Sequence, residues 1–173
     1  MTTSVSKHAS EAPSSFAHRI PVLAPISGRA KSLASSIEPL IAMRACGDGV
    51  CIEVSGSQLF TPFEGTILQF AETGETLVLK ANNGLILRLA FSSVLHQLMG
   101  ERIRRHVKSG DNVTAKQCLM DFDLAFLRSQ LTRVELYVTV LNGATLRAIT
   151  TPGGPDASMV VVANDDDLMT LFF

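Results

Sequence analysis

Short apolar runs separated by turn-forming residues constrain the fold of this chain more than any other feature of its sequence. The runs are rich in valine, isoleucine, leucine and phenylalanine, and glycine, asparagine or proline stands between most of them. Closely spaced short strands of this kind are typical of an all-β sandwich or barrel. The pattern predicts strands over residues 50–54, 66–70, 76–80, 85–91, 134–141, 145–149, 159–163 and 168–173.

The clearest local unit is a β-hairpin at Ala81-Asn82-Asn83-Gly84, which joins the strands predicted at 76–80 and 85–91. Asparagine and glycine tolerate the positive φ angles that tight hairpin turns need. Helical structure is predicted over residues 93–107, with one or two short turns at 121–130. The basic run from Arg102 to Lys108 is interpreted as a solvated face of that helix.

The composition predicts one domain with a large apolar core. Of 173 residues, 46% are hydrophobic and 18% are charged, which excludes an intrinsically disordered chain. Residues 1–19 show no periodic apolar pattern and are predicted to be a flexible tail. The domain is therefore expected to span residues 20–173.

Charge and targeting signals exclude several classes of partner. With 15 Lys and Arg against 16 Asp and Glu, the chain has no net charge that would attract nucleic acid or an anionic membrane. No apolar run reaches the roughly 18 residues of a membrane helix, and no signal peptide is recognisable. Three cysteines without a secretion signal fit a reducing compartment. We expect a cytoplasmic protein with no integral membrane segment and no nucleic-acid partner.

Residue types that carry catalysis or bind metals form no convincing motif. His96 and His106 stand apart and lack a neighbouring acid, whereas a zinc site needs three or four ligands. Cys46 and Cys51 are spaced too widely for a C-x-x-C motif, and the run Asp165–Asp167 lacks the glycine and distal glutamate of a calcium loop. The sequence therefore predicts no metal, no cofactor and no active site on motifs alone.

An ordered set of motifs nevertheless resembles a known family. The set comprises Ala24-Pro25-Ile26-Ser27-Gly28, Cys46-Gly47-Asp48-Gly49, the run from Thr61 to Ile67, Glu72-Thr73, Asn83-Gly84, Leu98-Met99-Gly100-Glu101, Gly110, Val113, Leu119 and Phe122-Asp123-Leu124. In this order and spacing they are similar to the glucose-type enzyme IIA domain of the bacterial phosphoenolpyruvate–sugar phosphotransferase system. The resemblance implies an antiparallel β-sandwich with short helical turns, in which Gly47, Gly49 and Gly65 form tight corners.

The resemblance also implies where family members carry phosphate. They use an acceptor histidine in a strand and a second histidine that orients it after a Thr-x pair. Here the acceptor position is Ala90, and the partner position is Glu75, which follows Thr73. Alanine has no nucleophile, so the site is interpreted as a degenerate phosphorylation site without catalytic residues. An acyl phosphate on Glu75 and transfer to His96 are the alternatives.

A partner-binding face is implied around the same position, because apolar residues ring the active histidine of the family and meet flat partner surfaces. Arg88 stands where the family tends to have an aromatic residue, and it is either an ion-pair partner of Glu75 or an independent solvated charge. The predicted face comprises Ile41, Ala45, Cys46, Ala71, Val78, Arg88 and His96.

These inferences predict a non-phosphorylatable regulatory module, monomeric by resemblance, that binds a protein partner: a transporter, an enzyme or another component of the phosphotransferase system. The alternative is a genuine IIA component that carries phosphate to a sugar permease. Drift without a retained role is a third interpretation. A zinc peptidase is disfavoured because no H-x-H motif is present, and a biotinyl or lipoyl carrier is disfavoured because Lys80 flanks the hairpin turn rather than occupying it.

Overall fold

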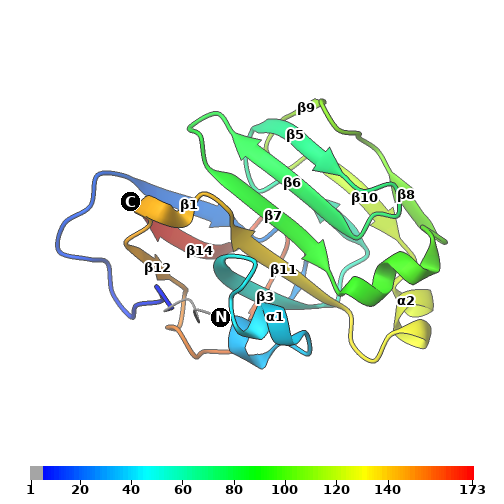
Figure 1. The fold of residues 1–173 in the computed structure, drawn as a ribbon, viewed down its shortest axis with the longest axis horizontal. Coiled ribbons are helices and arrows are strands. Elements are labelled where there is room, and N and C mark those ends of the chain that lie inside the picture. Colours follow the sequence, from blue (N-terminus) through cyan, green and yellow to red (C-terminus); the bar gives the residue numbers. More distant parts are fainter. Residues whose placement is uncertain (1–5) are drawn as a thin grey trace.

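Antiparallel sheets organise residues 6–173, the part of the chain that this computed structural model describes (Figure 1). The largest sheet has eight strands in the order β13-β2-β3-β11-β7-β6-β5-β9. Their bounds in chain order are β2 Gly28–Ser32, β3 Asp48–Val54, β5 Gly65–Phe70, β6 Thr76–Ala81, β7 Ile86–Phe91, β9 Asn112–Val113, β11 Glu135–Val140 and β13 Met159–Val161.

Two smaller sheets complete the fold, with strand orders β1-β14-β12 and β4-β10-β8. Their strands are β1 Arg19–Leu23, β4 Gln58–Phe60, β8 Ile103–Arg105, β10 Cys118–Phe122, β12 Ala148–Thr150 and β14 Asp167–Phe172. The helical segments are short: η1 Leu33–Ser35, α1 Pro39–Ala42, η2 Ser93–Leu98, α2 Leu124–Gln130 and η3 Gly143–Thr145. The predicted all-β, antiparallel sandwich with short helical turns is confirmed.

Side-chain alternation gives the large sheet a core face and an opposite face. On β7, Leu87 and Leu89 belong to the main apolar cluster, whereas Arg88 and Ala90 lie on the other side of the strand. On β11, Tyr137 belongs to a second, smaller cluster of buried residues together with Leu33, Ile41 and Cys51. The segment that contains η1 and α1 therefore covers part of the opposite face, and the candidate site lies beside it.

The predicted helix over residues 93–107 is wrong beyond Leu98. After η2 the chain reverses through Met99 and Gly100, whose φ angles are +51° and +78°. Ile103–Arg105 then forms β8, which pairs with β10 beyond the loop that contains β9. The predicted strand at 145–149 is also shifted, since η3 ends at Thr145 and β12 begins at Ala148.

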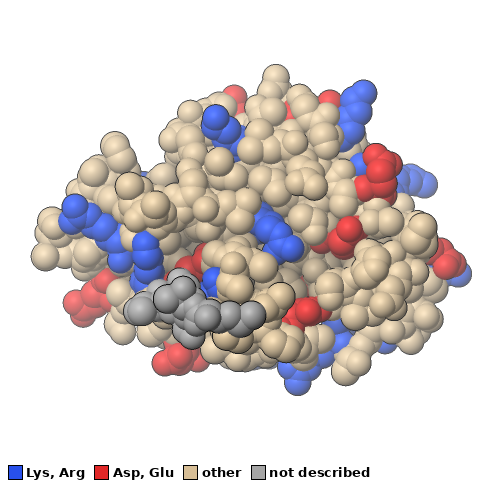
Figure 2. Space-filling model, viewed as in Figure 1, with Lys and Arg blue, Asp and Glu red and all other residues tan. Residues whose placement is uncertain are grey.

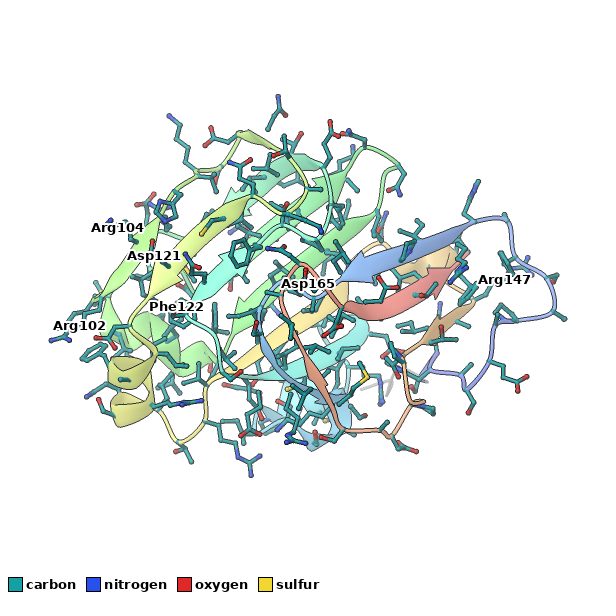
Figure 3. The ribbon with its side chains drawn as sticks, turned by 180° about the vertical axis from the view of Figure 1, so that it is seen from behind. Arg102, Arg104, Asp121, Phe122, Arg147 and Asp165 are labelled. Carbon is teal, nitrogen blue, oxygen red and sulfur yellow. The ribbon has the colours of Figure 1, made fainter. Side chains whose placement is uncertain are left out.

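The first half of the basic run consequently contains strand β8 rather than a helix face, and two of its arginines have specific partners. Arg102 pairs with Asp123 at 3.0 Å, and its guanidinium lies 4.9 Å from the centre of the Phe126 ring. Arg105 pairs with Glu72 at 2.6 Å. Figure 3 shows this end of β8 and β10 from behind. Charges of both signs meet there, so the run does not form a purely basic patch.

Two glycines expected at corners lie inside strands instead. Gly47 does form a corner, with a φ angle of +103°. A Cβ on Gly49 would stand 1.9 Å from the carbonyl oxygen of Val138, and a Cβ on Gly65 would stand 2.1 Å from that of Lys80. Close approach of neighbouring strands, rather than chain reversal, therefore explains these two glycines.

Part of the segment predicted to be a flexible tail contacts the domain. His8 forms an isolated parallel bridge with Ile149. Further along, the Phe16 ring meets the Phe172 ring edge-on, with 5.0 Å between their centres. Residues 1–5 lie outside the described residues, and the boundary between residues 19 and 20 stays a prediction.

Charged side chains of both signs are dispersed over the face seen in Figure 2. This agrees with the near-equal totals of 15 basic and 16 acidic residues. None of the helices in residues 6–173 has both the length and the apolar character needed to cross a membrane.

Candidate functional site

A depression of about 310 Å³ opens on the face of the large sheet that lies opposite the main core. Its floor is built by β6, β7 and β11, and Thr76 and Tyr137 flank Ala90 in register on the two neighbouring strands. Ala90 is 1% exposed. Ala90 is not itself among the residues that line the depression, and its side chain, which ends at Cβ, offers no nucleophile at this position.

Short helical segments form two sides of the depression. Leu40 and Ile41 of α1 line one side, and Ser93 and His96 of η2 line another. Apolar side chains continue outward along the same segments: Leu40 is 57% exposed and Met99 79% exposed, with Ile37, Met43 and Val94 also exposed. Exposed apolar surface around a depression is typical of an interaction site.

Glu38 joins the two sides of the depression. Its Oε1 accepts hydrogen bonds from the Ser92 hydroxyl at 2.7 Å, the Ser93 backbone N–H at 3.0 Å and the Ser93 hydroxyl at 3.0 Å. The Ser92 hydrogen bond, followed by those from Ser93, lowers the pKa of the Glu38 carboxyl below its usual value, although partial burial opposes the shift. The ionised carboxylate therefore ties the start of α1 to the start of η2.

We predict that Glu38→Ala lowers the free energy of unfolding by about 1 kcal/mol at pH 7, because it removes a hydrogen-bonded carboxylate from this tie. A carboxyl whose pKa is depressed by folding contributes stability above its ordinary pKa, here 4.5, and loses that contribution as the pH falls through the folded-state value. The difference from the wild type should therefore shrink below about pH 4.5. Urea unfolding at several pH values measures this.

Glu64→Ala is the matched control, since Glu64 is an exposed glutamate outside the depression. A Glu38→Ala effect that equals the control at pH 7, or that does not change with pH, would contradict the prediction.

A buried carboxylate anchors the covering segment to the sheet. Glu135 is 0% exposed and accepts hydrogen bonds from the Tyr137 hydroxyl at 3.0 Å and from the Ile37 backbone N–H at 3.3 Å. Lys31 Nζ stands 2.9 Å from its other oxygen. Burial by itself would raise the pKa of Glu135, but Lys31 and the hydrogen bonds outweigh it and hold the pKa below its usual value. This network fixes where α1 begins.

Glu75 and Arg88 both line the depression but do not pair. Glu75 precedes β6 and accepts a hydrogen bond from the Thr73 hydroxyl. Arg88 lies on β7 opposite Val78 and Thr139, and within residues 6–173 its Nη1 is buried without a hydrogen-bond partner. The ion pair considered from the sequence is therefore absent among the described contacts, and the depression holds a guanidinium with unused hydrogen-bonding capacity.

The structure brings together most of the residues that the sequence placed at the site. Ile41, Cys46, Glu75, Arg88 and His96 line the depression. Thr73 does not line the depression but donates a hydrogen bond to Glu75, which does. Val78, on β6, lies opposite Arg88, on β7. Ala45, Ala71 and Ala90 are not among the lining residues.

Six further residues that line the depression were not predicted from the sequence. They are Glu38, Leu40, Thr76, Phe91, Ser93 and Tyr137. Tyr137 carried a signal that could have been used, because it is the single tyrosine of the chain and interrupts an aliphatic strand. Nothing local in the sequence indicates that Glu38 contacts residues more than fifty positions away.

Comparison with known proteins addresses the identity of this fold and site. The profile of the family described as phosphoenolpyruvate-dependent sugar phosphotransferase system, EIIA 1, matches residues 20–146, well over half of the chain. The chain belongs to this EIIA family.

Individual relatives of this EIIA-family chain are consistent with this family assignment. A phosphotransferase-system glucose-specific EIIA component of Bacillus anthracis is 28% identical over 137 residues, covering 79% of this chain and 83% of the relative. A glucose-specific EIICBA component of Staphylococcus carnosus is 27% identical over 130 residues, which are 74% of this chain and 19% of that longer protein. The solved structure of glucose permease IIA from Mycoplasma capricolum has a TM-score of 0.77 at 19% identity, covering 89% of this chain and 96% of that one, and so shares the fold.

Zinc is not expected to bind in the depression of this EIIA-family chain. Position 90 offers no ligand and Glu75 offers one carboxylate, and residues 6–173 contain no group of three or more His, Cys, Asp or Glu side chains that could jointly hold a metal ion. A stable zinc site needs three or four such ligands. Elemental analysis of protein purified without a histidine tag should give well under one equivalent of zinc. Stoichiometric zinc that disappears in Glu75→Ala would contradict this.

Proposed function

We propose that this EIIA-family chain is a regulatory protein-binding module, linked to the sugar phosphotransferase system, that does not itself carry phosphate. The observation that carries the proposal is Ala90. At the position where the family resemblance implies an acceptor histidine, the chain has a buried methyl group between Thr76 and Tyr137, two residues that line the depression. Glu75 stands where the resemblance implies the second histidine, and its carboxylate repels an incoming phosphoryl group.

The surroundings of Ala90 support a binding role rather than decay. Glu38 joins α1 to η2, and Glu135 anchors the segment in front of α1. A face that had lost every role would not be expected to keep two charged networks in register across distant segments. The exposed apolar side chains along α1 and η2 supply the apolar part of an interface, and the guanidinium of Arg88 supplies a polar anchor.

The class of partner follows from chemistry and from relatives. Some relatives are longer proteins of which the matched part is 19%, among them the EIICBA component noted above and a protein named lactose permease from Lactobacillus delbrueckii subsp. bulgaricus, 29% identical over 122 residues. A transporter or another phosphotransferase-system component is therefore the proposed partner. The Arg88 side chain lines the depression, and its guanidinium fits a carboxylate presented by an otherwise apolar surface.

A genuine phosphocarrier remains the second candidate, and one observation favours it. His96 lines the same depression, and its Nδ1 contacts the carbonyl of Ser93. That contact suits a tautomer in which Nδ1 donates and Nε2 is the free nucleophile. The two candidates differ in one measurable property, the uptake of a phosphoryl group.

The binding proposal is tested by capture from the source cell with two baits, the wild-type chain and Arg88→Glu, followed by measurement of affinity with the purified partner. The proposal expects a phosphotransferase-system component or a transporter on the wild-type bait and much less of it on the variant. Equal recovery of every protein on both baits would contradict a binding role for this face.

A further inference from the structure

The segment that includes Lys7, His8 and Ala9 lies outside the stretch matched by the family and adds to an edge of the fold. Its backbone extends the β1-β14-β12 sheet beside β12: the Ile149 N–H donates to the Lys7 carbonyl at 2.9 Å, and the Ala9 N–H donates to the Ile149 carbonyl at 2.9 Å. The Lys7 ammonium also donates to the carbonyls of Gly143 and Leu146, at 2.8 and 2.6 Å. Residues 7–9, called the latch below, are thus held by both backbone and side chain.

One carboxylate joins the latch to the large sheet. Asp48, at the start of β3, has a side chain only 7% exposed. Its Oδ2 accepts the Lys7 backbone N–H at 2.7 Å, and its Oδ1 accepts Arg44 Nε at 3.0 Å. A buried carboxylate needs such donors, because an uncompensated charge is costly away from water. Asp48 is therefore satisfied by the latch on one oxygen, and by Arg44 and the Gly49 backbone N–H, at 2.9 Å, on the other.

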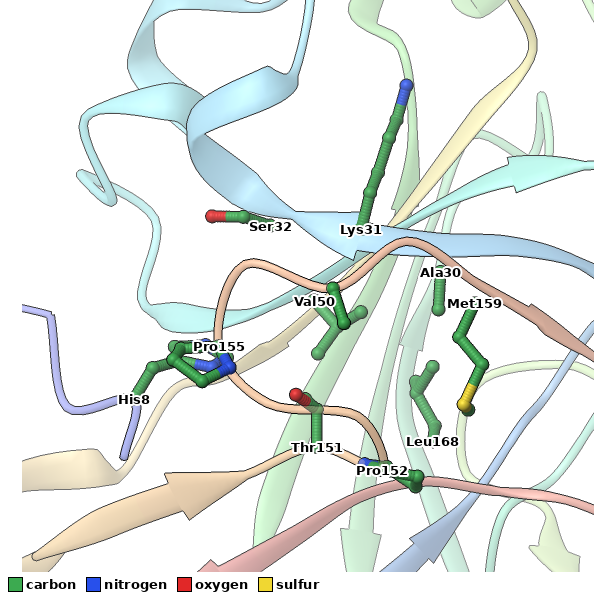
Figure 4. Close-up of a pocket in the computed structure, with 11 residues that line it drawn as sticks. His8, Ala30, Lys31, Ser32, Val50, Thr151, Pro152, Pro155, Met159 and Leu168 are labelled. Carbon is green, nitrogen blue, oxygen red and sulfur yellow. The ribbon is translucent and has the colours of Figure 1, made fainter. Parts of the chain in front are cut away.

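His8 closes the contact from the other side. Its ring is 6% exposed, and Nε2 donates to the carbonyl of Gly49 at 2.8 Å. Figure 4 shows the ring against Pro155 and near Thr151, from the C-terminal segment that also lies beyond the family match. Nδ1 is buried and, within residues 6–173, has no hydrogen-bond partner. The ring thus packs as a wedge between β3 and the loop that follows β12.

Arg44 connects this arrangement to the candidate site. It lies in the turn of residues 43–47 that joins α1 to β3, and its φ angle of +57° places it in the left-handed region. A non-glycine residue keeps this conformation only where the surroundings hold it. Here the hydrogen bond to Asp48 holds it, and Cys46 in the same turn lines the depression.

We propose that the latch positions one side of the candidate face: it fixes Asp48, Asp48 fixes Arg44, and Arg44 fixes the turn that carries Cys46. The chain of contacts consists of direct hydrogen bonds between neighbouring groups. The effect of the latch on the order of the turn does not depend on the proposed function, whereas the effect of the latch on partner binding rests on it. Release of the latch, by competition or cleavage, is then a means of weakening the face from a distance.

The test is hydrogen exchange of the full chain carrying His8→Ala, with His18→Ala as the matched control, since His18 is an exposed histidine of the same N-terminal segment. In His8→Ala we expect exchange to be at least about tenfold faster both in residues 7–9 and in residues 44–49, with β7 unchanged. In His18→Ala residues 44–49 should exchange as in the wild type. Faster exchange confined to residues 7–9 would overturn the proposal.

A second variant keeps the test decisive if His8→Ala does not fold. Lys7→Gln removes only the ammonium that caps Gly143 and Leu146 and leaves the buried ring in place. It should loosen residues 7–9 and 44–49 together by a smaller factor, and loosening of only one of the two segments would overturn the coupling.

Partner affinity separates this proposal from the proposed function. If Arg88→Glu abolishes binding while His8→Ala loosens the turn and leaves affinity unchanged, the face binds but the latch does not act on it. If neither variant changes affinity, the proposed role of this face in binding fails, and the exchange result alone decides whether the latch orders the turn.

Discussion

Incubation with phosphoenolpyruvate, the first enzyme of the phosphotransferase system and its histidine phosphocarrier is expected to leave the intact mass of this chain unchanged. The alanine methyl at position 90 has no lone pair to attack phosphorus, and the carboxylate of Glu75 disfavours an approaching phosphoryl group. Intact-mass spectrometry under conditions that preserve phosphohistidine measures the result. The glucose-specific EIIA relative of Bacillus anthracis serves as the positive control.

A stoichiometric gain of one phosphoryl group would contradict the proposed function. The variant His96→Ala then assigns the acceptor: loss of the added mass in this variant would establish the second candidate, a phosphocarrier with its nucleophile on η2. Retention of the added mass in His96→Ala would place the acceptor at another residue, such as Glu75, and would leave a phosphocarrier in place of the proposed function.

Restoring histidine at both positions, in Glu75→His combined with Ala90→His, is not expected to restore full transfer. Arg88 keeps a positive charge in the depression, and the hydrogen bonds of Glu38 with Ser92 and Ser93 keep η2 in place along one side of it. Both features would still oppose docking of the phosphocarrier. Phosphorylation of the double variant at the rate of the Bacillus anthracis relative would show that the two histidines alone account for the loss.

Local sequence signals predicted those strands whose turns are encoded nearby. The hairpin of β6 and β7 forms as expected, because Asn83-Gly84 fixes the turn and the flanking residues are apolar. The helical turns expected within residues 121–130 form α2, and the Asp123 side chain accepts the Phe126 N–H at its start. In such elements the decisive contacts are close in sequence.

Elements whose own residues do not favour a strand were missed. β8 and β10 were not predicted as strands, since β8 consists largely of arginine and its ladder with β10 spans intervening turns. β2 is short and polar, and only its place between β3 and β13 makes it a strand. Context of this kind overrides β-propensity.

The candidate site shows the same division. The family resemblance located Glu75, Arg88 and Ala90, which share one hairpin. It did not locate Glu38 or Tyr137, which reach the depression from α1 and β11 through contacts between distant segments. Whether Glu75 pairs with Arg88 could be decided only from the strand register. The register places Thr76 opposite Ala90, and Glu75, which precedes β6, accepts its hydrogen bond from Thr73.

Arg88→Glu is expected to weaken binding to the captured partner by about 2 kcal/mol or more, which is about thirtyfold in Kd. The guanidinium can pair with a partner carboxylate while its aliphatic stem covers apolar surface. In the variant a glutamate would face that carboxylate, so attraction becomes repulsion in a site that the partner closes to water. Isothermal titration with the purified partner measures the change.

The fold should tolerate the substitution, because within residues 6–173 Arg88 takes part in no ion pair and its Nη1 lacks a hydrogen-bond partner. We expect the free energy of unfolding to change by less than about 1 kcal/mol, as for substitutions that remove no specific contact. Arg104→Glu makes the same charge change at an exposed position of β8, outside the depression, and should leave affinity near the wild-type value. If Arg88→Glu binds as tightly as Arg104→Glu while both variants remain folded, Arg88 only solubilises the depression and the face does not bind through it.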